Sequence, residues 1–233
     1  MGCDKKMLFK GVVFDLDGTL LNSLEDLADS TNTVLARLGF PCHELEKYNY
    51  FVGDGMFNLL RRALPAERQE DNDFIKKCVV AMKEEYSKHW SDKTRPYHGV
   101  MDLLRILRKK ELKLAVLSNK PHEFTQVVVE KYFPGHFDLA FGERSGIPRK
   151  PDPQGALAIA EAMQLTPAEF LYLGDTNTDM RTAIAAGMFP VGVLWGFRSA
   201  EEILAAGAKV LIEHPSELLK LLNYPSFQGH CTT

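Results

Sequence analysis

Residues 12–20 read VVFDLDGTL, and this stretch decides the fold. An apolar run leads into two aspartates, Asp15 and Asp17, and a turn follows at Gly18. Strands covered by helices on both faces are apolar throughout. In open α/β sheets, ligands bind beyond the carboxyl ends of the strands. We therefore expect a buried parallel strand that carries two carboxylates to a ligand site.

Five further apolar runs alternate with amphipathic helical stretches. This alternation predicts an α/β fold with a doubly wound parallel sheet. Apolar residues spaced from Val100 to Leu107 predict one of the helices, while Pro121 marks a helix start and Gly187 and Gly207 mark helix ends. The six expected strands span residues 11–15, 112–118, 137–141, 170–174, 190–194 and 209–213.

One segment departs from this alternation, because residues 20–92 contain helical stripes and no convincing strand. Ser23 and Asp26 resemble a capping box at the start of its first helix. We call residues 20–92 the insert and predict that it is a small helical domain placed after the first strand. Residues 1–19 and 93–225 then form the α/β core, and residues 226–233 form a C-terminal tail.

Composition narrows the class of protein. The 233 residues are 45% hydrophobic and 25% charged, as in an ordinary globular chain. Lys and Arg total 28 against 31 Asp and Glu, and this net charge of −3 argues against nucleic acid as a partner but allows a small phosphorylated substrate. Four scattered cysteines fit a reducing compartment. With no signal peptide, and no apolar stretch of the ~18 residues that span a bilayer, we expect a cytoplasmic protein without a membrane segment.

Two carboxylates as close as Asp15 and Asp17 repel each other, so a cation binds between them or one of them takes a proton. Their hard oxygen atoms suit Mg²⁺, which prefers a few carboxylates together with water and phosphate oxygens. An aspartate can also attack phosphorus to form an aspartyl-phosphate. The plain alternative is a strand that ends in solvated acids at a turn.

Polar residues recur where the later strands end. Ser118 and Asn119 end the second expected strand, and a serine hydroxyl there can donate to a phosphoryl oxygen. Lys150, in a Lys-Pro-x-Pro run, can balance the charge on Asp15 and a phosphoryl group. Asp175 and Asp179 follow the fourth strand at a spacing that places both in a first helical turn. The plain alternatives are a turn, a solvated lysine and helix-capping aspartates.

In this order, the four patterns resemble the motifs of the haloacid dehalogenase superfamily, phosphatase branch. The resemblance implies that Asp15 is the nucleophile and that Asp17 is the general acid and base. It implies that the Asp15 carboxylate, the Asp17 backbone carbonyl and Asp175 hold Mg²⁺, with Asp179 orienting the metal ligands or the lysine.

The same resemblance assigns phosphate binding to the turn and to the later strand ends. The residues given this role are Gly18, Thr19, Ser118, Asn119 and Lys150. Arg149 has no counterpart in the motif, and we expect it on the surface.

A helical insert after the first motif acts as a cap over the substrate in this superfamily. Within the insert, Gly53, Asp54 and Gly55 precede a helix, and their backbone N–H groups can approach an anion, so we count them as substrate candidates. A glycine turn between helices is the alternative. This segment and residues 193–199 resemble phosphoglycolate phosphatases. Arg61 and Arg62 lie off the apolar stripe, and we expect them in solvent.

The leading hypothesis is a Mg²⁺-dependent phosphatase that acts on a small phosphorylated metabolite through an aspartyl-phosphate, with 2-phosphoglycolate as the first substrate to test. A sugar-phosphate mutase of the same superfamily shares every motif and differs by keeping the phosphoryl group from water. A noncatalytic phosphate-binding protein on this scaffold is a further alternative. The sequence allows a monomer or a homodimer.

Overall fold

A computed structural model describes residues 9–222, and the predicted tail at 226–233 and two of the four cysteines, Cys3 and Cys231, lie outside this range. Its centre is a six-stranded sheet in the order β5-β4-β1-β6-β7-β8, in which every neighbouring pair is parallel. This confirms the predicted α/β fold. The strands are β1 (Gly11–Phe14), β4 (Lys113–Pro121), β5 (Leu139–Glu143), β6 (Phe170–Gly174), β7 (Phe189–Val193) and β8 (Val210–Ile212).

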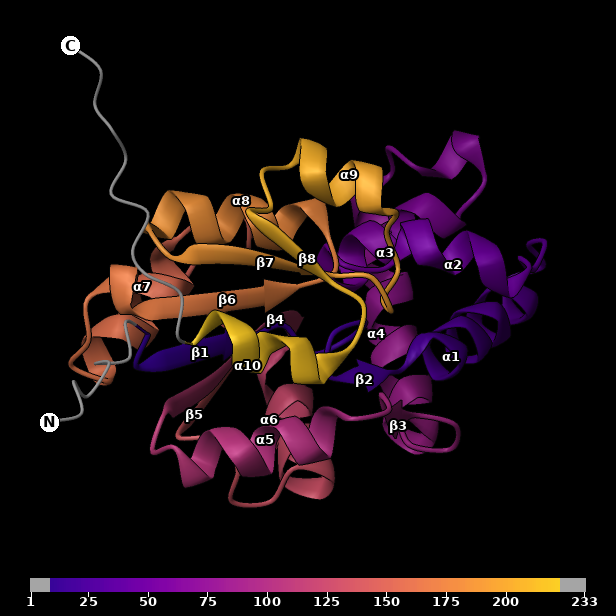
Figure 1. The fold of residues 1–233 in the computed structure, drawn as a ribbon. Coiled ribbons are helices and arrows are strands. Elements are labelled where there is room, and N and C mark those ends of the chain that lie inside the picture. Colours follow the sequence, from indigo (N-terminus) through magenta and orange to yellow (C-terminus); the bar gives the residue numbers. More distant parts are fainter. Residues whose placement is uncertain (1–8, 223–233) are drawn as a thin grey trace, which may run out of the picture.

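Helices cover both faces of this sheet (Figure 1). Alternate residues of β1 point to opposite faces, so Val12 packs with one layer of helices and Val13 with the other. The first layer contains α5 (Val100–Lys109), α6 (His122–Tyr132) and α10 (Leu218–Leu221). The second contains α7 (Gln154–Ala162) and α8 (Asn177–Ala186), and α9 (Ala200–Ala205) lies between β7 and β8 in the chain. Two 3₁₀ turns, Pro167–Glu169 and Pro215–Glu217, complete the core.

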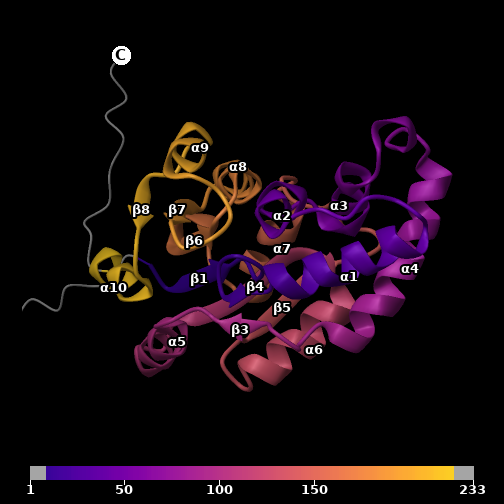
Figure 2. The same ribbon diagram turned by 90° about the vertical axis from the view of Figure 1, so that its right-hand side faces the viewer.

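The insert has an apolar interior of its own. It contains α1 (Leu24–Arg37), α2 (Leu45–Phe51), α3 (Gly55–Ala63), the 3₁₀ turn Ala66–Arg68 and α4 (Asn72–His89). Buried residues of all these helices except α2 form one cluster, which includes Leu35, Leu60 and Met82, and to which Phe197 of the core also belongs. Figure 2 shows the four helices grouped beside the sheet. In Figure 1 the strands β6 and β7 point toward this group. The carboxyl ends of the strands therefore face the insert.

Two local predictions are wrong. A short strand, β2 (Leu21–Asn22), does lie within residues 20–92, and it pairs antiparallel with β3 (Arg95–Pro96), because the two connections between insert and core run side by side. The strand predicted at residues 137–141 is shifted, because β5 starts at Leu139. The Asp138 side chain, just before it, accepts a hydrogen bond from the backbone N–H of Leu114. The bounds proposed for the insert stay a prediction.

The predicted capping box at Ser23 is also wrong. Ser23 makes no side-chain capping bond and its hydroxyl donates to Asp17 at 2.6 Å. The Asp26 carboxylate accepts from the backbone N–H groups of Lys93 and Thr94 and from the Thr94 hydroxyl, at 2.7–3.1 Å. The helix does begin after Ser23, at Leu24, but neither side chain caps it: Ser23 binds Asp17, six residues earlier, and Asp26 binds the segment at Lys93 and Thr94.

Leu60→Ala should lower the free energy of unfolding by about 2–5 kcal/mol, because Leu60 is fully buried and the shorter side chain leaves a cavity. Leu38→Ala is the matched control, since Leu38 is 42% exposed just after α1, and it should change stability by less than about 0.5 kcal/mol. Urea denaturation measures both. Equal losses would contradict a separately packed insert.

Candidate active site

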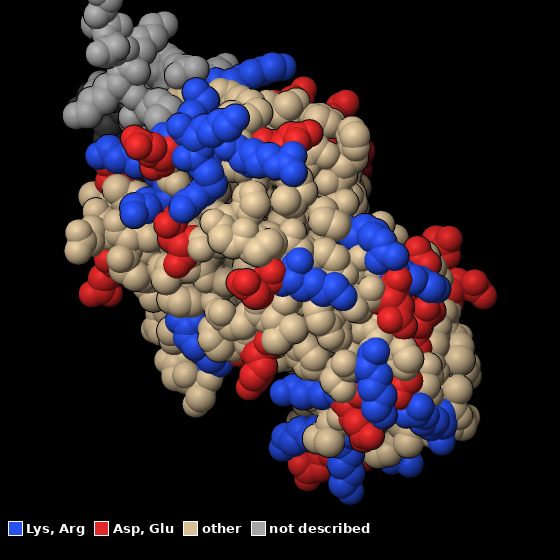
Figure 3. Space-filling view, turned by 90° about the horizontal axis from the view of Figure 1, so that it is seen from below, with Lys and Arg blue, Asp and Glu red and all other residues tan. Residues whose placement is uncertain are grey.

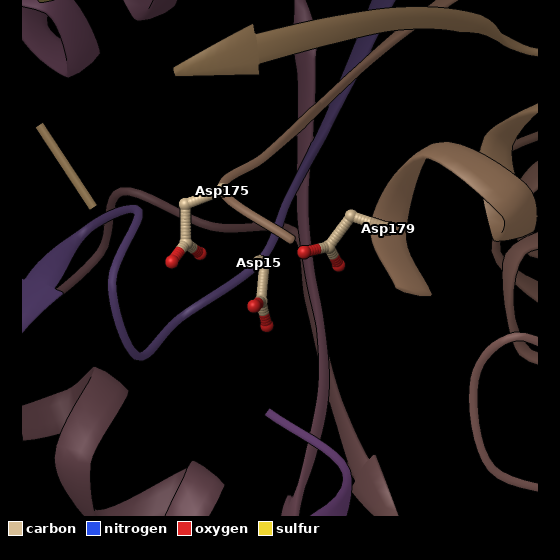
Figure 4. Close-up of side chains that lie close together, drawn as sticks. All are labelled: Asp15, Asp175 and Asp179. Atoms are coloured by element: carbon tan, nitrogen blue, oxygen red, sulfur yellow. The ribbon is translucent and has the colours of Figure 1, made fainter. Parts of the chain in front are cut away.

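The strand order brings the predicted motifs to one edge of the sheet. β1 lies between β4 and β6, so the residues that follow these three strands meet. Asp15 follows β1, Ser118 lies near the end of β4, and Asp175 follows β6. Asp179 reaches the same place from α8, and Figure 4 shows the Asp15, Asp175 and Asp179 side chains lying close together. One oxygen atom of each of these three lies within 4.8 Å of the others.

A single ammonium group lies among these buried carboxylates. Lys150 Nζ is 2.8 Å from Asp15 Oδ1 and 2.7 Å from Asp179 Oδ1. Burial by itself would lower the pKa of Lys150, but the Asp15 and Asp179 carboxylates outweigh it and raise that pKa well above its ordinary value. Three carboxylates against one ammonium leave an excess of negative charge in a site that water hardly reaches.

The pKa values of Asp15 and Asp175 are raised in these surroundings. Burial raises the pKa of Asp15 well above 3.8, and repulsion from Asp179 adds to the shift. Burial, again followed by Asp179, raises the pKa of Asp175 to about 7. A bound cation would relieve both causes. Hard carboxylate oxygens at this spacing fit a divalent cation of the Mg²⁺ type.

Asp175 is held by two hydrogen bonds and lies against Gly18, where any side chain would collide with it. Its oxygens accept a hydrogen bond from the Thr19 hydroxyl at 3.0 Å and from the Phe197 backbone N–H at 2.9 Å. Gly18 has a φ of +92°, and a Cβ atom there would lie 2.2 Å from Asp175 Oδ2. Gly18 and Thr19, predicted to bind phosphate, thus lie beside Asp175.

Asp179 occupies the third position of α8 and forms a reciprocal capping box with Thr176. One of its oxygens accepts a hydrogen bond from Thr176 and the other from Lys150. Asp179 is thereby fixed at the start of α8 and in turn positions the Lys150 ammonium. The expectation that Asp175 shares this helical turn is wrong, because α8 begins at Asn177 and Asp175 lies in the preceding turn.

Asn119 joins three segments. Its side-chain amide donates to the backbone carbonyls of Gly53 and Lys150, at 3.2 and 3.1 Å, and its oxygen accepts from the Lys150 N–H at 2.9 Å. The Ser118 hydroxyl accepts from the backbone N–H of Lys120 at 3.2 Å. Asn119 therefore positions the Lys150 segment and contacts the insert, and Ser118 lies beside it.

Lys120 is a site residue that the sequence analysis missed. Its ammonium lies 3.1 Å from both carboxylate oxygens of Asp17 and 2.8 Å from the hydroxyl of Tyr86 on α4. The signal that could have found it is a lysine that directly continues an apolar strand, at a position where burial is expected. Burial by itself would lower the pKa of Lys120, but the Asp17 carboxylate and the Tyr86 hydroxyl raise it above its ordinary value.

A small cavity lies between the core and the insert, with a volume of about 40 Å³. Asp15, Asp17, Ser118, Asn119, Lys120 and Pro121 line it from the core. The insert contributes Gly53 and Gly55 together with the apolar side chains of Leu27, Val52, Met56 and Leu59. Asp54 does not line it.

The loop that carries Asp54 contacts the core instead. The Asp54 carboxylate accepts from the Thr178 hydroxyl at 2.8 Å and pairs with Arg62. Arg149 reaches the Asp54 carbonyl at 3.4 Å, and Arg198 donates to the Val52 carbonyl at 3.0 Å. The expectation that the Arg62 side chain lies in solvent is therefore wrong, because it pairs with Asp54. Arg149 is half-buried against the insert. Both lie near charged or carbonyl groups that only the folded chain assembles.

Asp175→Asn should stabilise the protein at pH 8 when divalent cations are removed by a chelator. The folded-state pKa of Asp175, about 7, lies above its reference value of 3.8, so its contribution to stability is lost as pH rises through that range. The parent should therefore lose more stability than the variant between pH 5 and pH 8. Urea denaturation at both pH values measures the difference.

Asp73→Asn is the control, because the Asp73 side chain is 87% exposed, and its stability should follow the parent within about 0.5 kcal/mol at both pH values. Added Mg²⁺ should stabilise the parent more than Asp175→Asn. An Asp175→Asn protein that loses as much stability as the parent would contradict the buried-charge account.

Comparison with known proteins places this geometry in a family. The family described as haloacid dehalogenase-like hydrolase matches residues 12–193. A phosphoglycolate phosphatase of Thiobacillus denitrificans is 32% identical over 197 residues, covering 83% of this chain and 87% of the relative. A phosphoglycolate phosphatase of Pseudomonas putida is 33% identical over 211 residues, covering 89% of this chain and 78% of the relative.

Solved structures show the same likeness. A crystal structure from Lactobacillus delbrueckii subsp. bulgaricus, provisionally named a phosphoglycolate phosphatase, has a TM-score of 0.86 and 31% identity, covering 92% of this chain and 98% of its own. Among residues 9–222, no helix is long and apolar enough to cross a membrane. The family match spans the first strand, the insert and the sheet edge where the aspartates meet, and the chain belongs to the haloacid dehalogenase-like hydrolases.

Proposed function

We propose that the protein is a Mg²⁺-dependent phosphatase that hydrolyses a small phosphomonoester through an aspartyl-phosphate on Asp15. The observation that carries the proposal is that Asp15 and Asp17 line one small cavity together with Ser118. A nucleophile, a proton donor and a phosphate-binding hydroxyl therefore face the same enclosed space. The family to which the chain belongs supports this assignment.

Asp15 and Asp17 divide the chemistry. An Asp15 oxygen attacks phosphorus, the bond from phosphorus to the leaving oxygen breaks, and Asp17 gives its proton to that oxygen. Water then attacks the phosphorus of the aspartyl-phosphate and gives a proton to Asp17. This releases inorganic phosphate and restores the Asp15 carboxylate.

The surrounding residues balance charge and hold the reacting groups. The Asp15 and Asp175 carboxylates and the Asp17 carbonyl would hold Mg²⁺, which when bound would neutralise charge on the phosphoryl group. Lys150 offsets the charge shared by Asp15 and the phosphoryl group, and Asp179 orients this lysine. Ser118 donates to a phosphoryl oxygen, supported by Asn119 and by the turn at 18–19.

The size of the cavity supports a small substrate. A volume of about 40 Å³ corresponds to about three water molecules at 10–15 Å³ each, which favours a small substrate over a large one. Relatives named phosphoglycolate phosphatase make 2-phosphoglycolate the first candidate. The Gly53 and Gly55 backbone then faces the remainder of the substrate, and the insert closes over it and excludes water.

The distribution of charge and thiols fits a metabolite substrate inside the cell. Figure 3 shows one face on which positive side chains gather in the upper part with negative ones beside them, but the net charge of −3 lacks the excess of basic residues that a nucleic-acid partner would require. Cys42 and Cys78 are free thiols, which suits a reducing compartment, and we propose a cytoplasmic location.

Asp15→Asn should reduce kcat for 2-phosphoglycolate to background, because an amide is no nucleophile for phosphorus, and should leave the fold intact. Phosphate release in the presence of Mg²⁺ measures kcat, and circular dichroism checks the fold. Asp102→Asn, which removes a carboxylate that is 77% exposed on α5, should keep parental activity. Normal turnover by Asp15→Asn would exclude the mechanism.

A substrate panel tests the size of the site. We expect kcat/KM for 2-phosphoglycolate to exceed that for AMP by at least about tenfold, because the cavity between core and insert is small and a nucleoside is the bulkier group. Phosphate release and analysis of sugar-phosphate isomers are measured in parallel with hexose phosphates. An isomerised sugar phosphate without phosphate release would identify a mutase, and binding of phosphate without any turnover would identify a noncatalytic protein.

A further inference from the structure

Lys120 occupies a place that the proposed mechanism does not use. Among the described residues that line the cavity, it is the only one with a positive side chain. Its side chain is 3% exposed, and it lies between a side chain of the core and a side chain of the insert. A buried lysine in such a place serves either the substrate or a neighbouring protein group.

The contacts of the ammonium decide between these two roles. An ammonium group has three donors, and Lys120 Nζ meets three acceptors: both oxygens of Asp17 at 3.1 Å and the Tyr86 hydroxyl at 2.8 Å. The Tyr86 ring lies 4.6 Å from the same nitrogen. All three donors have partners within the protein, so Lys120 acts on the substrate through Asp17.

Asp17 has a further contact that fixes its orientation. The Ser23 hydroxyl donates to Asp17 Oδ1 at 2.6 Å, so the carboxylate is held from two directions. The backbone N–H of Lys120 donates to Ser118 Oγ at 3.2 Å. Lys120 therefore connects the proton-transfer group to the hydroxyl assigned to phosphate.

Tyr86 makes this arrangement depend on the insert. It is 1% exposed on α4, and its ring packs edge to face against Phe124 of α6 in the core, with ring centroids 5.4 Å apart. Movement of α4 away from the core would remove one of the three acceptors of Lys120 and part of its cover from water. The contacts of Lys120 therefore depend on the position of the insert relative to the core.

We propose that Lys120 is a positioning residue that holds the Asp17 carboxylate for proton transfer, and that Tyr86 makes this hold effective when the insert covers the site. The inference rests on the proposed phosphatase function, since it concerns the proton step of that reaction. It adds two residues, Lys120 of the core and Tyr86 of the insert, to those to which the proposed mechanism gives a role.

The test separates the two chemical steps by choice of leaving group. p-Nitrophenolate leaves without a proton, whereas the alcohol of 2-phosphoglycolate requires one from Asp17. Hydrolysis of the aspartyl-phosphate needs Asp17 with either substrate. The variants are Lys120→Met, which keeps the length of the chain, and Tyr86→Phe, which removes one hydroxyl. Lys131→Met is the control, because Lys131 also lies over aromatic rings, those of Trp90 and Tyr132, away from the cavity.

For Lys120→Met we expect kcat with 2-phosphoglycolate to fall about 100-fold, the low end of the contribution of a positioned acid or base, with KM changed little. With p-nitrophenyl phosphate, rapid mixing should show a burst of one p-nitrophenolate per enzyme at close to the parental rate, followed by slow turnover. Tyr86→Phe should show the same pattern with a smaller loss, and Lys131→Met should match the parent.

Either of two results would overturn the inference: parental kcat of Lys120→Met with 2-phosphoglycolate, or a first step slowed equally for both leaving groups, which is the signature of general damage. If Lys120→Met does not fold, Tyr86→Phe decides. A parental ratio between the first-step rates with the two substrates, measured by rapid mixing of that variant, rejects the inference. Failure of the parent to hydrolyse any phosphomonoester with Mg²⁺ rejects the proposed function itself and is seen before any variant is made.

Discussion

The repulsion among Asp15, Asp175 and Asp179 is the constraint on which the site depends. Lys150 pairs with only two of these three buried carboxylates, those of Asp15 and Asp179. Burial raises the pKa of Asp15 and of Asp175, because little water compensates their charge. Such a cluster lowers stability as pH rises unless a cation joins it. A fold that keeps it requires rigid support, which the capping box of α8 and the close approach at Gly18 supply.

The sheet supplies that support because its strands are held by apolar packing on both faces. β1 is covered on both faces and flanked by β4 and β6, so its carboxyl end is fixed on every side. Polar side chains just beyond buried strands are held in fixed positions, because the strands are fixed by apolar packing that the site does not disturb. This explains how a net repulsive cluster persists at the edge of a stable core.

The sequence predicts what depends on local pattern and misses what depends on long-range pairing. Apolar runs located the six sheet strands to within a few residues. The motifs at or beyond the ends of these runs then singled out Asp15, Ser118, Lys150 and Asp175 as candidate site residues. Lys120 was missed because its partners, Asp17 and Tyr86, lie 103 and 34 residues away. Asp26 was misassigned for the same reason, because its partner Thr94 lies 68 residues away. Ser23 matches the spacing of a capping box, but its hydroxyl binds Asp17 in the preceding turn instead.

The same distinction describes how the insert is held. Its interior is an apolar cluster, in which each buried leucine contributes about 1.5–3 kcal/mol. Its contacts with the core combine apolar packing of Phe197 and Phe124 with single polar bonds, such as Asp54 with Thr178, Asn119 with the Gly53 carbonyl and Lys120 with Tyr86, each with a net contribution of about 0.5–1.5 kcal/mol. Because the helices of the insert share one apolar cluster, the insert should move as one body. Opening then breaks the polar contacts together, including the one that holds Lys120 against Asp17.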